Sequence, residues 1–139
     1  MAGKGEIKSY RDLLIWQKGM ELAKRVYTLT RVFPNDERFG LTAQMRRAAV
    51  SVPSNIAEGQ ARHGRLEFVH FLSHAEGSLA EVDTQLTLAV ELGYCRPCDA
   101  DRSLVTVAEL QKMLASLRGK LAGRLTLHHE PTAALVPSH

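Results

Sequence analysis

The sequence predicts an all-α protein, an antiparallel up-down-up-down bundle of four helices. Apolar residues recur in steps of three and four along four segments, and this is the spacing of one helix face. The connections between the segments are short, so consecutive helices are expected to pack side by side. A chain of 139 residues fits one domain, and its hydrophobic content of 45% is enough for a core of its own.

The first helix is expected over residues 10–31, because its apolar residues form one stripe with others beside it. The stripe consists of Leu13, Trp16, Met20, Ala23, Tyr27 and Thr30, widened by Leu14, Val26, Leu29 and Phe33. Pro34 ends the helix, since the residue before a proline avoids helical geometry. Residues 1–9 are rich in Gly and Lys and are expected to be flexible, so the predicted bundle covers residues 10–125.

The second helix is expected from residue 41 or 42 to 58, with Gly59 as its C-terminal stop. Its apolar stripe is Leu41, Met45, Ala48, Ala49, Val52 and Ile56. Its polar stripe is Gln44, Arg47, Ser51, Asn55 and Glu58. The polar stripe is either a solvated face or a partner surface, and its low content of Lys and Glu keeps the partner surface in contention.

Pro53 lies well inside this helical pattern. A proline lacks the amide donor, and its ring crowds the carbonyl of Ala49, at a cost of about 3 kcal/mol in a helix interior. We therefore predict a bend between Ala49 and Ile56. The bend either curves the helix around the core or serves a function of its own.

The third helix is expected over residues 65–92, with a core face of Phe68, Phe71, Leu72, Ala75, Leu79, Val82, Leu86, Ala89 and Val90. A second stripe contains His70, His74, Gly77 and Glu81. The two histidines could bind a metal, but no third ligand is evident, so we interpret them as polar contacts and expect no metal. Gly77 and Ser78 in a helix interior indicate close approach of another helix.

The fourth helix is expected from Asp99, a good N-cap, to residue 125, followed by a flexible tail over residues 126–139. Its core seam is Leu104, Val107, Leu110, Leu114, Leu117, Leu121 and Leu125. Cys95 and Cys98 precede it in a Cys-x-x-Cys pair, which is half of a zinc site without a second half. Two reduced thiols are the favoured interpretation, and a disulfide or a metal between subunits is the alternative.

The second-helix segment also carries a family signature. It reads Leu-x-x-Gln-x-Arg-Arg-Ala-Ala-x-Ser-x-Pro-x-Asn-Ile-Ala-Glu-Gly over residues 41–59, and matching positions extend over roughly residues 10 to 120. The chain thereby resembles the four-helix-bundle proteins encoded within intervening sequences of bacterial 23S ribosomal RNA genes. The resemblance implies a five-fold ring and no enzymatic activity. A related branch, the accessory protein of diversity-generating retroelements, binds nucleic acid and a reverse transcriptase.

Charge is distributed unevenly along the chain. Residues 1–65 hold 12 Lys or Arg against 6 Asp or Glu, whereas residues 66–110 hold 2 against 8. The basic part could attract nucleic acid or the acidic part of a neighbouring copy. The candidate nucleic-acid-binding residues are Lys18, Arg25, Arg46, Arg47, Arg62 and Arg65. The candidate subunit-interface residues are Gln44, Arg47, Ser51, Asn55, Glu58, His74, Gly77, Ser78 and Glu81.

The sequence offers no acid–base pair, no nucleophile with its base and no glycine-rich phosphate loop, so we expect no enzyme and no cofactor. It also lacks a signal-peptide core and an apolar run of about 20 residues, so we expect a cytoplasmic protein with no membrane segment. One hypothesis is a ring-forming scaffold or adaptor that binds RNA, DNA or a nucleic-acid-processing protein. The alternative is a self-assembling module that binds no nucleic acid.

Overall fold

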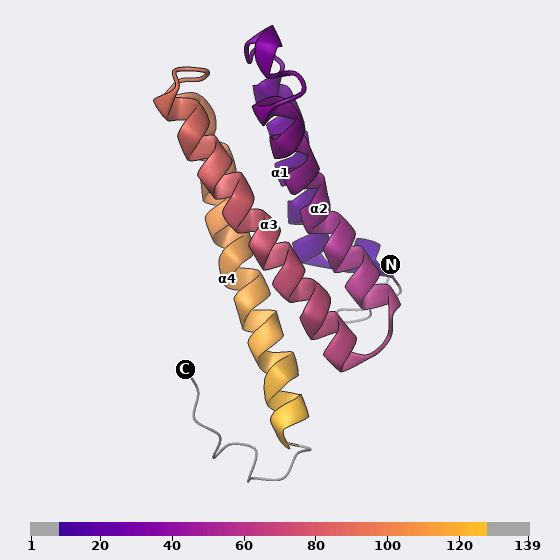
Figure 1. The fold of residues 1–139 in the computed structure, drawn as a ribbon. Coiled ribbons are helices and arrows are strands. Elements are labelled where there is room, and N and C mark those ends of the chain that lie inside the picture. The colour runs from indigo at the N-terminus through magenta and orange to yellow at the C-terminus, as the bar shows by residue number, and fades with distance from the viewer. Residues whose placement is uncertain (1–8, 128–139) are drawn as a thin grey trace.

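The computed structural model describes residues 9–127, most of which form four helices. A 3-10 turn, η1 (Tyr10–Asp12), precedes α1 (Leu14–Thr30), and a second, η2 (Asn35–Glu37), precedes α2 (Leu41–Ala61). They are followed by α3 (Arg65–Glu91) and α4 (Pro97–Leu127). Successive helices run in opposite directions (Figure 1), and residues 9–127 contain no strand. The predicted all-α four-helix bundle is confirmed.

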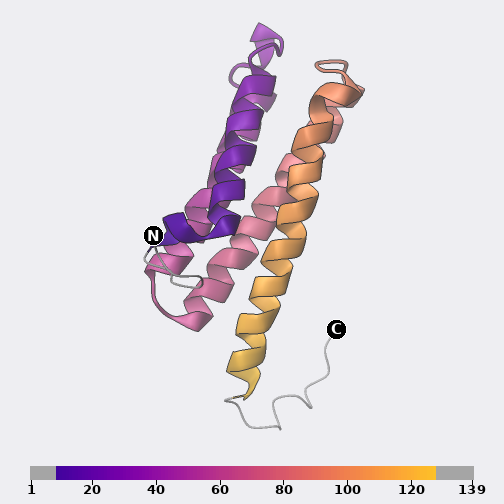
Figure 2. The same ribbon diagram turned by 180° about the vertical axis from the view of Figure 1, so that it is seen from behind.

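The predicted ends of the helices differ from the observed ones by a few residues. The first predicted helix is divided into η1 and α1, and the fourth begins at Pro97 rather than at Asp99. The end of α4 extends past the α2–α3 connection (Figure 2), and the helix includes residues 126 and 127 of the expected tail. The rest of that tail and residues 1–8 of the expected flexible N-terminus lie outside the described residues. None of the described helices is both long and apolar enough to span a bilayer.

The core lies along the seams that periodicity predicts for α2, α3 and α4. Every member of the predicted α2 stripe is buried, as are Leu72, Leu79 and Leu86 on α3. On α4, Leu110 and Leu114 are completely buried. Removing one such side chain from water contributes about 1.5–3 kcal/mol, so these seams supply most of the stability of the bundle.

The predicted core face of α1 is partly wrong. Met20 and Tyr27 are exposed, and Leu14 is 58% exposed. Ala23, Val26 and Thr30 are buried as predicted, and the other buried positions are Ile15, Gly19 and Leu22. Apolar residues occupy more than half of the circumference of this helix, so the sequence allows more than one seam. Packing against α2 and α4 selects among them.

Glycines mark where the helices approach one another. α2 does not stop at Gly59 as predicted but continues to Ala61, and Gly59 is buried against α3. A Cβ atom there would lie 2.7 Å from Cβ of Phe71 and 3.0 Å from Cδ1 of Phe68. At Gly77, where close approach was expected, no atom of the described residues lies within 4 Å of the Cβ position, its chain neighbours and the backbone of its own helix aside. The close approach within the chain is therefore at Gly59.

Pro53 is buried at a second close contact. A Cβ atom added to Gly19 of α1 would lie 3.3 Å from Cβ of Pro53. α2 is continuous across Pro53, and the bend at this position stays a prediction. The proline ring therefore packs on a part of α1 that has no side chain.

Glu37 joins two connections at one end of the bundle. The amide of Leu41, at the start of α2, donates to its Oε1 at 3.0 Å. The hydroxyl of Tyr94, from the α3–α4 connection, donates to its Oε2 at 2.7 Å. These two hydrogen bonds lower the pKa of Glu37 below its ordinary value of 4.5. The carboxylate caps α2 and orients the segment that continues into Arg38 and Phe39.

Candidate functional site

A polar hollow lies between α2 and α3, with a volume of about 390 Å³. It is lined by Gln44, Arg47, Ala48, Ser51, Ser78 and Glu81. The hydroxyl oxygens of Ser51 and Ser78 are 2.8 Å apart. The amide of Asn55 donates to the carbonyl and to the hydroxyl of Ser51, at 2.8 and 2.9 Å. The structure thus brings six of the predicted interface residues together.

Two opposite charges in the polar hollow are free to pair with another molecule. Arg47 and Glu81 are both exposed, and neither forms an ion pair within residues 9–127. Glu76, one helical turn before, is instead bound by Arg118 of α4. Arg47 and Glu81 therefore line the same hollow without forming an ion pair with each other.

The remaining interface candidates lie outside the polar hollow. Glu58 is paired with Arg62, His74 contacts His70, and Gly77 lies exposed on α3. Gln85, two turns after Ser78 on α3, is a further buried polar residue that was not predicted. Gln85 is buried and its side-chain oxygen has no hydrogen-bond partner in the described structure. In the sequence, Gln85 is recognisable as a polar residue beside the apolar core positions of α3.

A second surface combines arginines with aromatic rings. This arginine–aromatic surface consists of Tyr27, Arg38, Phe39, Arg46 and Arg47, around a depression of about 460 Å³. Phe39 is 84% exposed, and the guanidinium carbon of Arg38 lies 4.8 Å from the centre of its ring. The guanidinium carbon of Arg46 lies 4.6 Å from the Tyr27 ring, while its Nε donates to the hydroxyl of Thr30 at 2.9 Å.

The chemistry of this surface suits a partner with both negative charge and flat apolar groups. Arg38, Arg46 and Arg47 form no ion pair within the described chain. Stacked guanidinium groups keep their charge and donors available, and an exposed ring offers a stacking platform. Sequence reasoning assigned Tyr27 to the core and overlooked Arg38 and Phe39. In the sequence, these two residues are recognisable as an adjacent Arg-Phe pair in the connection before α2.

The other predicted nucleic-acid residues do not join this surface. Lys18 forms an ion pair with Glu109 of α4 at 3.1 Å, and Arg25 pairs with Glu21 at 3.4 Å. Arg62 is held by Glu58 at 2.8 Å and by Glu67 at 3.7 Å. Arg65 is exposed at the first position of α3. Three of the six candidate cations are therefore paired within the chain.

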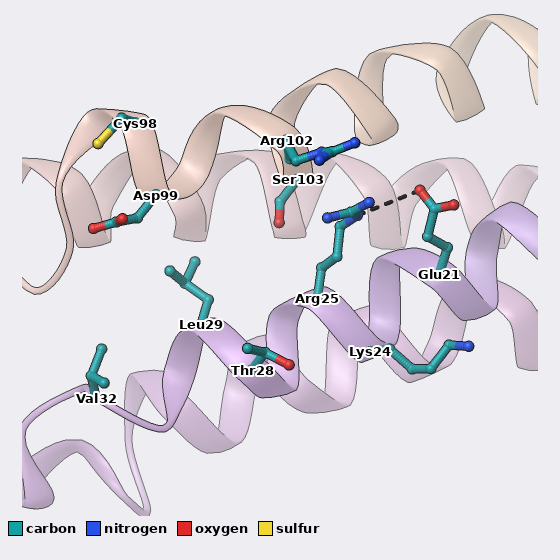
Figure 3. Close-up of a pocket in the computed structure, with 10 residues that line it drawn as sticks. All are labelled: Glu21, Lys24, Arg25, Thr28, Leu29, Val32, Cys98, Asp99, Arg102 and Ser103. Carbon is teal, nitrogen blue, oxygen red and sulfur yellow. Dashed lines mark hydrogen bonds and ion pairs between the residues drawn. The ribbon is translucent and has the colours of Figure 1, made fainter.

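A groove of about 580 Å³ lies between α1 and α4 (Figure 3). Arg25 reaches from α1 toward α4, where Arg102 and Ser103 lie.

At the start of α4, Arg96 donates to both carboxylate oxygens of Asp99 and lowers the pKa of that group. No three His, Cys, Asp or Glu side chains within residues 9–127 are placed to hold a metal ion.

Comparison with known proteins shows a family match in sequence and a likeness in fold. The family model for the 23S rRNA-intervening sequence protein matches residues 11–116. A solved structure from Bacteroides thetaiotaomicron VPI-5482, a protein of unknown function from the S23 ribosomal protein family, superposes with a TM-score of 0.70. It is 23% identical, over 76% of this chain and 98% of that chain, so the likeness concerns the fold alone. No curated protein matches the sequence.

Proposed function

The chain belongs to the family of 23S rRNA-intervening sequence proteins, and we propose that it is a non-enzymatic, ring-forming scaffold that binds nucleic acid or a nucleoprotein partner. The observation that carries the proposal is the arginine–aromatic surface. Three guanidinium groups without a carboxylate partner in the described chain stand beside an almost fully exposed Phe39. Exposed Tyr27 and Val50 line the same depression as Phe39, and an apolar patch rimmed by polar groups marks an interaction site.

Single-stranded nucleic acid has the two features that this surface matches. Its phosphates pair with Arg38 and Arg47, and an unstacked base packs on the ring of Phe39. Base–aromatic stacking contributes about 1–3 kcal/mol per base and tolerates any sequence. Arginine contacts to phosphate add affinity that falls with salt, because bound counterions are released. We therefore propose RNA or DNA binding without strong sequence preference.

Assembly into a ring of copies is the second part of the proposal, and its five-fold order comes from the family resemblance. The polar hollow supports a head-to-tail contact, since it offers Arg47 and Glu81 to another chain. A head-to-tail contact joins two different patches and closes a ring when the rotation fits. Exposed ion pairs contribute only about 0.2–1 kcal/mol each, so apolar area must supply most of the association energy.

The competing function is a self-assembling module that binds no nucleic acid. Arginine and aromatic residues are also the side chains enriched at protein–protein contacts. In this case a neighbouring subunit covers Phe39 and Arg38, and the arginine–aromatic surface is buried in the interface between subunits. The two functions differ in whether the arginine–aromatic surface binds nucleic acid, so RNA binding measured together with the assembly state separates them.

The test measures fluorescence anisotropy of a labelled 20-nucleotide RNA at several salt concentrations. The variant carries Arg38→Gln and Arg47→Gln, and the control carries Lys112→Gln and Lys120→Gln, which remove the same charge from exposed positions of α4. Arg46 is left intact because it bonds to Thr30. Each lost phosphate contact lowers the salt slope by about 0.7, so the variant should lose about 1.4 and the control almost nothing.

Light scattering on the same samples supplies the assembly state. If the wild type binds no RNA or DNA at low salt while its ring is intact, the scaffold loses its nucleic-acid role and the self-assembly function stands. If the Arg38 and Arg47 variant dissociates into monomers near 15.4 kDa, those arginines hold subunits together. A wild type that is itself monomeric at micromolar concentration would remove the ring.

A further inference from the structure

Two histidines of α3 converge through the same ring atom. His70 and His74 are four residues apart, and their Nε2 atoms lie 3.1 Å from each other. The ring centres are 4.6 Å apart and the ring planes make an angle of 82°. Both side chains are exposed on α3, near its connection to α2. Two nitrogens at this separation can act on one atom between them.

We propose that His70 and His74 bind one divalent transition-metal ion, of the class that prefers imidazole nitrogen: Zn²⁺, Ni²⁺ or Cu²⁺. Metal–nitrogen bonds of this class are about 2.0–2.1 Å long. An ion at that distance from both Nε2 atoms subtends an angle of about 98°, given their separation of 3.1 Å. This value lies between the octahedral and tetrahedral angles, so the separation of the two Nε2 atoms fits shared coordination of one ion.

A cation near the pair is compensated by carboxylates. Arg62 lies over the Phe71 ring at 5.3 Å, and Phe71 in turn contacts the ring of His70. The positive charge of Arg62 is neutralised by Glu58 at 2.8 Å and Glu67 at 3.7 Å. The guanidinium of Arg62 is thus compensated by two carboxylates rather than left unpaired near the histidines.

Exposure of both rings leaves the remaining coordination positions open to water. The described chain supplies only these two ligands, since no group of three is placed for a metal. In the absence of metal, the same geometry is an Nε2–H···Nε2 hydrogen bond. Water competes with that bond at an exposed site, so its net contribution is small. Coordination of an ion by two nitrogens from adjacent turns would also tie together the first half of α3.

The test is calorimetric titration of the full-length chain with Ni²⁺. Other thiols and the C-terminal histidines must not compete, so the reference chain carries Gln at His128, His129 and His139 and Ser at Cys95 and Cys98. In this reference chain, His70→Gln and His74→Gln are compared with the control His63→Gln. Circular dichroism verifies that each variant folds, which is expected because the substituted histidines are exposed.

We expect one ion per chain in the reference and in the His63→Gln variant. Loss of either His70 or His74 should weaken Ni²⁺ binding at least tenfold. The thermal unfolding midpoint should rise with Ni²⁺ in the reference chain and not in the His74→Gln variant, because only the folded helix brings the two rings together. Absence of binding at millimolar Ni²⁺ would overturn the proposal, as would equal affinity in the His74→Gln variant. A stoichiometry of one ion per two chains would overturn the single-chain site.

Discussion

Substitution of Gly59 by alanine should destabilise the bundle, although alanine is the better helix former. Gly59 is buried inside α2, where its hydrogen faces the aromatic side chains of α3. A methyl group would lie 2.7 Å from Cβ of Phe71 and 3.0 Å from Cδ1 of Phe68. Cβ of Phe71 is attached directly to the backbone and cannot rotate away, so α2 and α3 must separate.

The expected magnitude follows from two opposing terms. Alanine in place of glycine in a helix interior contributes about 1 kcal/mol of stability. An extra methyl group in a packed interior costs about 1–3 kcal/mol. The net change at Gly59 is therefore a loss of about 0–2 kcal/mol in the free energy of unfolding. At Gly119 of α4, which is exposed and has open space at its Cβ position, only the gain applies.

Urea unfolding at one fixed protein concentration measures both variants against the wild type. A fixed concentration is needed because assembly would add to the apparent stability. The Gly59→Ala variant should be less stable than the Gly119→Ala variant by about 1–3 kcal/mol. If Gly59→Ala stabilises the protein as much as Gly119→Ala does, the close approach of α2 and α3 is refuted.

Three further predictions concern the connections and the exposed face of α3. Tyr94→Phe should lower stability at neutral pH. The hydroxyl of Tyr94 helps to lower the pKa of Glu37, so the ionised carboxylate stabilises the fold at pH values above 4.5, the ordinary pKa of a glutamate. The difference from wild type should shrink as the pH falls below 4.5 and Glu37 is protonated; a constant difference in urea titrations from pH 7 to 3 would contradict this. Cys98 is exposed. The pKa of the Cys95 thiol is raised, mainly by burial and further by the negative charge of Asp99. Iodoacetamide should therefore modify Cys98 first, and faster labelling of Cys95 in peptide mass spectra would count against the assignment. Gly77→Leu should leave the fold intact but weaken assembly if α3 forms the subunit contact, and light scattering that finds an unchanged ring would exclude Gly77 from that contact.

The candidate site was partly accessible from the sequence. The polar stripe of α2 and the small residues of α3 were both recognised, and the structure joins them through Ser51 and Ser78. Only their positive charge makes Lys18 and the five arginines candidates for nucleic-acid binding, and a sequence does not reveal which of them form ion pairs within the fold. Lys18 is paired with a residue 91 positions away, so no local pattern could show that it is occupied.

The sequence by itself determined the number of helices and the core faces of α2, α3 and α4. Those properties depend on residues three and four apart, and such spacing is visible in a linear chain. Tertiary structure alone decided which face of α1 is buried, because its apolar residues are too widely distributed to define one seam. It also decided that α2 and α3 approach closely at Gly59 within the chain, and that the Nε2 atoms of His70 and His74 converge. These outcomes depend on distances between side chains of different turns and helices, and packing sets those distances.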